Sequence, residues 1–165
     1  MFIPFNEISE NARTWIFAAE KELNKSQLNE INNILAAFTD NWQSHNQNVH
    51  STFQIIDKQF IVIAADGEKS DISGCGIDKS MHVILELEQK LQITLTNKSL
   101  LFFKSREETF SVPLSGIKQA VLNNELSPNS LYYNTLAATV KEVKNSFCIP
   151  AQNSWLKKYF ILQTN

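Results

Sequence analysis

The chain has 165 residues, 43% of them hydrophobic, which is enough to build a core for one domain without metals or disulfides. Its formal net charge of −2 provides no field that would attract nucleic acid or anionic lipid, so we expect no nucleic acid and no membrane among its partners. The first residues lack the features of a signal peptide, and two cysteines are too few for a disulfide framework. The composition therefore predicts a cytoplasmic protein.

Apolar patterns in the first part of the chain predict alternating strands and helices. In order, they indicate a strand over 13–19, a helix from Ser26 to Trp42, strands over 50–56 and 60–65, a helix over 78–90, and strands over 92–96 and 100–103. The unbroken apolar run over 60–65 is typical of a central strand buried on both faces. This order is that of a ferredoxin-like βαββαβ core, in which two helices cover one face of an antiparallel sheet. We therefore expect an α+β fold.

The C-terminal third, over 105–165, is predicted to be a mostly helical extension of the same domain. Phe110 and Val112 indicate a strand, and Pro113 is placed to begin a short helix. Thr139 and Glu142 have the spacing of a capping box that opens another helix. No linker-like stretch separates this part from the core over about 12–104, so residues 1–165 are expected to form a single domain.

A glycine-bearing connection, Ser73-Gly74-Cys75-Gly76-Ile77-Asp78-Lys79-Ser80, joins the apolar strand to the second helix. The chain has four glycines, and three of them, Gly67, Gly74 and Gly76, lie between these two elements. Because glycine adopts positive φ and allows close approach, the cluster predicts a tight strand-to-helix turn.

The ferredoxin-like order also predicts which residues surround this turn. The first helix would end at the sheet edge where the second begins, so we expect Trp42, His45 and His50 to approach it. Glycines at a helix start can offer backbone N–H groups to an anion. Our first hypothesis is therefore a binding module that holds a small anion or the acidic group of a protein partner. Its expected ligand-binding residues are Ser73, Gly74, Gly76, Asp78, Lys79, Ser80, Trp42 and His82.

The alternative is a thiol-dependent enzyme or redox sensor in which Cys75 is the nucleophile. A thiol at a helix N-terminus is favoured as thiolate, and His45 could act as its base, with His82 a weaker candidate. The structural alternative is that Cys75 is a buried turn residue and that the histidines are solvated or packed. A third hypothesis is that the chain is a protein–protein interaction domain. It would form a homodimer or bind another protein through a sheet edge or the segment around Trp155.

Phosphate-binding and metal-binding motifs are incomplete. The string from Gly74 to Ser80 resembles a Walker A loop, but Asp78 stands where its second glycine is required, and the leading glycine is one residue too near. We therefore expect no ATPase activity and no cofactor. Three scattered histidines and two distant cysteines do not have the spacing of metal ligands, so no metal site is predicted.

Several of these strings resemble one known family. They are Arg13-Thr14-Trp15-Ile16-Phe17, Trp42-x-x-His45, the Ser73–Ser80 string with His82, and Asn153-Ser154-Trp155. Together they are similar to short bacterial proteins, chiefly from Bacteroidetes, that are often labelled "ABC transporter ATPase". That family has serine at the position of Gly76, so the resemblance implies a looser turn here with one hydroxyl fewer. It implies no catalytic residues, because the family has no established activity.

Overall fold

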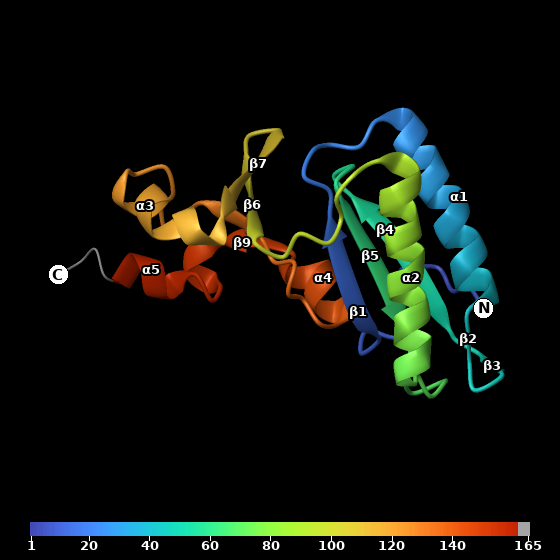
Figure 1. Ribbon diagram of the computed structural model, residues 1–165. Helices are drawn as coiled ribbons and strands as arrows, with labels where there is room; N and C mark the ends of the chain where they lie inside the picture. Colours follow the sequence, from blue (N-terminus) through green and yellow to red (C-terminus); the bar gives the residue numbers. More distant parts are fainter. Residues whose placement is uncertain (162–165) are drawn as a thin grey trace. The chain divides into compact units, whose positions relative to one another are not determined.

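The structure, a computed structural model, describes residues 1–161 and contains helices together with antiparallel sheets (Figure 1). The predicted α+β class is confirmed. The chain divides into two compact units, and each is built from two separate segments. The first unit comprises Met1–Thr96 and Leu136–Lys144, and the second comprises Asn97–Thr135 and the chain from Asn145 onward. Among the described residues, no helix is long and apolar enough to cross a membrane.

The first unit is built on a three-stranded antiparallel sheet of β1 (Arg13–Ala18), β4 (Ser51–Ile56) and β5 (Phe60–Ala65). The strand order is β1-β5-β4, so β5 is central, and all six of its residues are buried. The prediction of a central strand covered on both faces is confirmed. The unbroken apolar sequence indicates this position, because a strand buried on both faces has no solvent-exposed positions that polar residues would occupy.

Two helices, α1 (Lys25–Asn41) and α2 (Gly74–Leu91), lie side by side on one face of this sheet (Figure 1). The apolar stripe of α1 is buried at Ile31 and Leu35. In α2, Ile84 is buried, but Met81 and Leu85 are exposed. The buried face of α2 lies to one side of them. It consists of Gly76, Ser80, Val83, Ile84 and Leu87.

The opposite face of the sheet is covered by the N-terminal segment and by α4 (Val140–Ser146). There Ala64 of β5 packs with Ile8, Ala12 and Val140. The predicted capping box of α4 is confirmed, because the Glu142 N–H donates to Thr139 Oγ1 at 3.2 Å and the Glu142 carboxylate accepts the Thr139 N–H at 3.0 Å.

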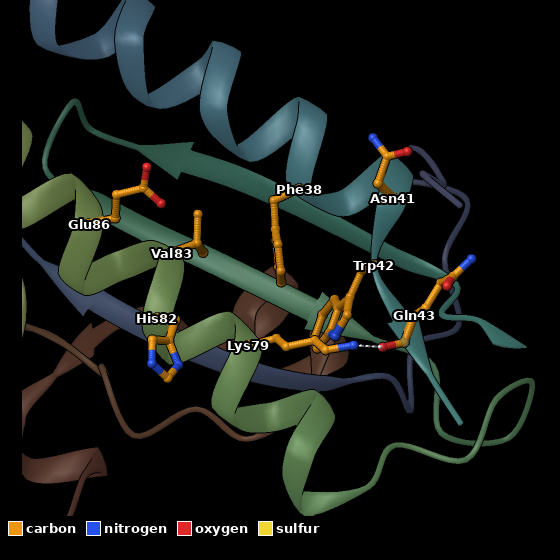
Figure 2. Close-up of a pocket in the computed structure, with 8 residues that line it drawn as sticks. All are labelled: Phe38, Asn41, Trp42, Gln43, Lys79, His82, Val83 and Glu86. Carbon is orange, nitrogen blue, oxygen red and sulfur yellow. Dashed lines mark hydrogen bonds between the residues drawn. The ribbon is translucent and has the colours of Figure 1, made fainter. Parts of the chain in front are cut away.

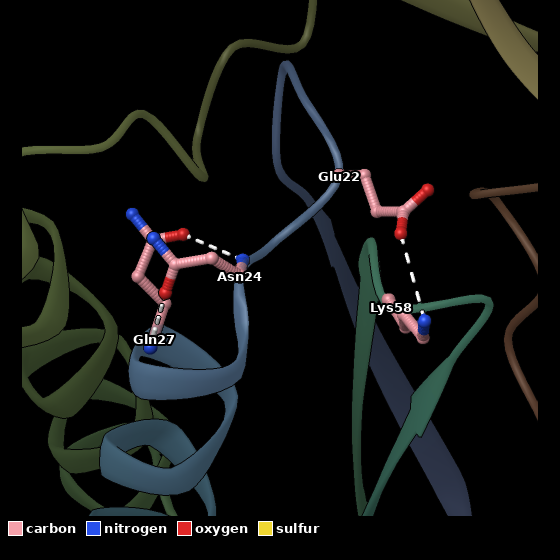
Figure 3. A network of polar contacts seen from close by, with 4 residues as sticks. All are labelled: Glu22, Asn24, Gln27 and Lys58. Carbon is pink, nitrogen blue, oxygen red and sulfur yellow. Dashed lines mark hydrogen bonds and ion pairs between the residues drawn. The ribbon is translucent and has the colours of Figure 1, made fainter.

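The start of α1 differs slightly from the expectation. Asn24, not Ser26, is the N-cap, and it forms a capping box with Gln27 (Figure 3). The Gln27 N–H donates to Asn24 Oδ1 at 2.8 Å, and the Asn24 N–H donates to Gln27 Oε1 at 2.9 Å. A nearby ion pair between Lys58 and Glu22, 3.7 Å apart, is exposed on both sides and so contributes little to stability.

The predicted strand over 92–96 is wrong, because this segment is irregular. Gln92 ends α2 in the left-handed conformation, at φ 53 and ψ 46. The Glu88 carboxylate then accepts the Leu95 N–H at 2.8 Å and the Thr96 hydroxyl at 3.0 Å. Leu95 is buried, which accounts for the apolar signal, but Glu88 takes the backbone N–H that a sheet partner would need.

The second unit contains a four-stranded sheet in the order β7-β6-β8-β9. Its strands are β6 (Leu100–Ser105), β7 (Glu108–Pro113), β8 (Leu131–Tyr133) and β9 (Cys148–Pro150), and its helices are η1 (Leu114–Gly116), α3 (Ile117–Leu122), η2 (Ala151–Asn153) and α5 (Lys157–Ile161). Since β6 pairs with β7 and β8, it does not complete the sheet of the first unit. A ferredoxin-like core and a mostly helical C-terminal extension are therefore not confirmed. Pro113, predicted to begin a short helix, is both the last residue of β7 and the N-cap of η1, which α3 follows directly.

Candidate functional site

The start of α2 lies one turn earlier than predicted. Ser73 is the N-cap, with its Oγ accepting the Gly76 N–H at 3.3 Å, and the helix begins at Gly74 rather than at Asp78. Cys75 therefore lies in the first helical turn and not in a connection that precedes it. No described glycine has positive φ, so the prediction of a turn that depends on positive φ is wrong. The sequence contained the correct signal, because serine is a strong N-cap residue.

The segment over 43–48 is a small hairpin beside this helix start. It pairs β2 (Gln43–Ser44) with β3 (Gln47–Asn48) through a two-residue turn. The turn residues His45 and Asn46 have φ of 51 and 61, as a type I′ turn requires. Asparagine tolerates this conformation well, and it is the one local signal that the sequence offered for the hairpin.

Trp42 and Ser44 fix the start of α2, and we call their bonds the helix-start contact. The indole N–H of Trp42 donates to the Gly76 carbonyl at 3.1 Å. Ser44 Oγ accepts the Ser73 N–H at 3.1 Å and lies 3.0 Å from Ser73 Oγ. A Cβ at position 76 would lie 3.3 Å from Ser44 Oγ, so glycine there permits the close approach. The predicted approach of Trp42 to this segment is confirmed.

Two backbone donors at the helix start are unused. Within residues 1–161, the N–H groups of Gly74 and Cys75 have no hydrogen-bond partner, whereas the next N–H group, of Gly76, is capped. Gly74 and Cys75 are exposed, and a Cβ at Gly74 would meet nothing within 4 Å. The helix therefore presents two adjacent donors and its positive dipole end to solvent.

The thiol of Cys75 lies on the surface, but no histidine is hydrogen-bonded to it within residues 1–161. Cys75 is exposed, which contradicts the alternative that it is a buried turn residue. His45 is exposed at the tip of the hairpin, and within residues 1–161 no hydrogen bond links it to Cys75. His50 lies just before β4, where its carbonyl accepts the Asp66 N–H at 2.9 Å.

The remaining predicted residues are engaged elsewhere on α2. The Ser80 hydroxyl is buried and donates to the Ile77 carbonyl at 2.7 Å, so it does not reach the exposed helix start. Asp78 is exposed, and its backbone carbonyl oxygen lies 3.0 Å from His82 Nδ1. The Lys79 ammonium donates to the Gln43 carbonyl at 2.9 Å. Lys79 is thus directed to the side of α2.

A groove of about 380 Å³ lies between α1 and α2 at this end of the first unit (Figure 2). Trp42, Lys79 and His82, three of the predicted site residues, are on its wall. The other lining residues were not predicted from the sequence, although positions 79, 83 and 86 share one side of a helix and so indicate a common surface. Its complete lining is Phe38, Asn41, Trp42, Gln43, Lys79, His82, Val83 and Glu86.

Groups of three or more His, Cys, Asp or Glu side chains suited to hold a metal ion are absent from residues 1–161. Comparisons with models of known protein families, with curated proteins and with solved structures found no match to this chain.

Proposed function

We propose that the protein is a binding module and that the exposed start of α2 holds a small anion or the acidic group of a partner. The observation that carries this proposal is the pair of unpartnered N–H groups of Gly74 and Cys75 on a helix start that Trp42 and Ser44 hold in place. Hydrogen bonds from these groups to an anion would be charge-assisted, and the dipole of an 18-residue helix would strengthen them.

The helix-start contact also supports binding by keeping the site ordered before a ligand arrives. Ser73 and Ser44 exchange two close contacts, and Gly76 is held through both its N–H and its carbonyl. A site that is already ordered loses little conformational entropy when it binds, so more of the interaction energy appears as affinity.

We make further proposals from the sequence. We propose that the protein is not an ATPase, since Gly74–Ser80 is helical and forms no phosphate loop. A cytoplasmic location is supported by two exposed cysteines that form no disulfide. Membership of the Bacteroidetes-type family is supported by the Ser73–Ser80 string. A ferredoxin-like origin of the first unit is supported by its strand order and by two helices on one face of the sheet.

The anion site is tested by removing one donor without removing the helix. Proline is tolerated at the first helical position, and Ser73 has the extended conformation, φ −71 and ψ 166, that a following proline requires. Gly74→Pro deletes the N–H, whereas the matched control Gly74→Ala keeps it. In calorimetric titrations with inorganic phosphate, we expect Gly74→Ala to bind like the wild type and Gly74→Pro to bind about tenfold more weakly. Equal affinities, or no binding to the wild type, would refute the proposal.

The second candidate function, a thiol-dependent enzyme or redox sensor, is favoured by the exposure of Cys75 in the first turn of α2. Cysteines that react with electrophiles are typically partly exposed and often lie at a helix N-terminus. Cys148, also exposed and outside any disulfide, supplies the comparison. We expect iodoacetamide to alkylate Cys75 in Cys148→Ser faster than Cys148 in Cys75→Ser at pH 7. A slower or equal rate for Cys75 would contradict this function.

A further inference from the structure

We propose that the groove between α1 and α2 binds a dipolar ligand of dipeptide size, with the ligand carboxylate at Lys79 and the ligand ammonium group at Glu86 (Figure 2). This site lies beside the exposed start of α2 but uses different groups. The amides of Gly74 and Cys75 take no part in dipeptide binding, so the groove proposal can be tested independently of the anion site.

The two charged side chains in the groove are not neutralised by the protein. Lys79 donates to the Gln43 carbonyl, which leaves the other hydrogens of its ammonium group available. Within residues 1–161, neither Lys79 nor Glu86 has an ion-pair partner, and the Glu86 carboxylate has no hydrogen bond. Farther along the same two helices, by contrast, Glu30 and Lys90 do pair with each other.

Within residues 1–161, Lys79 and Glu86 form no ion pair with one another. They are seven residues apart on α2, which places them on the same side of the helix but about 10.5 Å apart along its axis. The groove therefore has a positive charge towards one end and a negative charge towards the other, as Figure 2 shows for their side chains. A ligand with separated opposite charges is complementary to this arrangement, whereas a simple anion would meet the Glu86 carboxylate.

Besides His82, the side chains that line the groove between the two charges are apolar. Phe38 from α1 and Trp42 form an aromatic pair with ring centroids 4.9 Å apart, and Val83 of α2 is buried beside them. Such a surface binds an apolar side chain by removing it from water. The ligand is thus expected to carry an apolar group between its two charged ends.

The dimensions indicate a dipeptide rather than a single amino acid. Two extended residues span about 7 Å, and the long side chains of Lys79 and Glu86 can reach the two ends of such a ligand from backbone positions about 10.5 Å apart along the helix axis. The two charges of one amino acid are too close together to reach both side chains. A volume of about 380 Å³ also lies within the range of small-molecule sites, roughly 300–1,000 Å³.

The test is a calorimetric titration of the full-length protein with leucyl-leucine, its C-terminal amide, its N-acetyl derivative and free leucine. We expect the dipeptide to bind about tenfold more tightly than each of the other three, because each loses one end contact. In Lys79→Gln the preference for dipeptide over its amide should vanish, and in Glu86→Gln the preference over the N-acetyl derivative should vanish.

The controls distinguish this site from general charge effects and from the anion site. Lys25→Gln and Glu68→Gln remove exposed charges elsewhere in the first unit and should leave both preferences intact. Gly74→Pro, which removes a donor at the helix start, should also bind the dipeptide normally. The proposal is overturned if the dipeptide does not bind, if its derivatives or leucine bind equally well, or if the groove variants keep both preferences.

Discussion

At the scale of single residues, Trp42 connects the end of α1 to the start of α2. Its side chain is buried, lies against Phe38 and Trp15, and gives its N–H to the carbonyl of Gly76. Sequence spacing indicated that Trp42 and the Ser73–Ser80 string meet, because both lie at the same end of a helical layer. It could not show which of the helix-start polar groups remain unused, since that depends on individual hydrogen bonds.

Tyr132 provides a prediction about pH in the second unit. Burial raises the pKa of Tyr132 above its ordinary value of 10.0, and hydrogen bonds with Trp155 and Thr135 oppose this rise. The folded protein therefore holds the phenol proton more tightly than the unfolded chain. The stability that this group contributes is complete below pH 10 and is lost as the pH rises from there towards the raised pKa.

The measurement is urea unfolding of the wild type and Tyr132→Phe between pH 8 and pH 11. At pH 8 the variant should be about 1 kcal/mol less stable, because the Trp155 indole N–H loses its acceptor. This difference should shrink above pH 10. Burial lowers the pKa of Lys98, which has the opposite effect on stability, but Lys98 is present in both proteins. A constant difference would contradict the assignment.

At the scale of elements, the two glycines at the start of α2 differ in what surrounds them. Gly74 faces open space, whereas a Cβ on Gly76 would lie 3.3 Å from the Oγ and 3.4 Å from the Cβ of Ser44. Ser44 cannot move away without losing its bonds to Ser73. Within a helix, alanine is otherwise about 1 kcal/mol more favourable than glycine.

We therefore expect opposite outcomes for two alanine substitutions in the same helical turn. Gly74→Ala should leave the free energy of unfolding unchanged or raise it by up to about 1 kcal/mol, and Gly76→Ala should lower it by about 1 kcal/mol or more. Urea unfolding followed by circular dichroism measures both. Equal effects of the two substitutions would show that Ser44 does not restrict position 76.

The sequence predicts well those elements whose apolar residues follow a regular pattern of burial. In β5 every residue is apolar, and in α1 an apolar residue recurs at each helical turn, so both patterns are strong. The segment over 92–96 has the same apolar character but is irregular, since the Glu88 side chain takes its backbone N–H. Similarly, a ferredoxin-like core was expected, but β6 joins the sheet of the second unit, and no local pattern specifies which sheet a strand joins.

At the scale of the whole molecule, each unit depends on two stretches that are distant in sequence. Val140, which follows most of the second unit's strands along the chain, packs with Ala64, Ile8 and Ala12 of the first unit and is completely buried. Sequence patterns alone predicted one domain, because no linker-like composition marks the points where the chain passes from one unit to the other.

We predict that Val140→Ala destabilises the first unit by about 1–3 kcal/mol, since it leaves a cavity against β5. Unfolding should be followed in a Trp155→Phe background, so that fluorescence reports Trp15 and Trp42 alone. Val112→Ala, at a half-buried position of the second unit, is the control and should shift this transition less. An unchanged midpoint for Val140→Ala would mean that α4 does not support the first sheet.

The central claim is that the amides of Gly74 and Cys75 bind an acidic group at the start of α2, which the helix-start contact holds in place. A titration of isotopically labelled protein with inorganic phosphate, followed through backbone amide resonances, tests it most directly. We predict that the resonances of Gly74 and Cys75 shift most and saturate together, and that Gly74→Pro largely abolishes the shift at Cys75. Shifts confined to surface lysines, with these two amides unmoved, would contradict the claim.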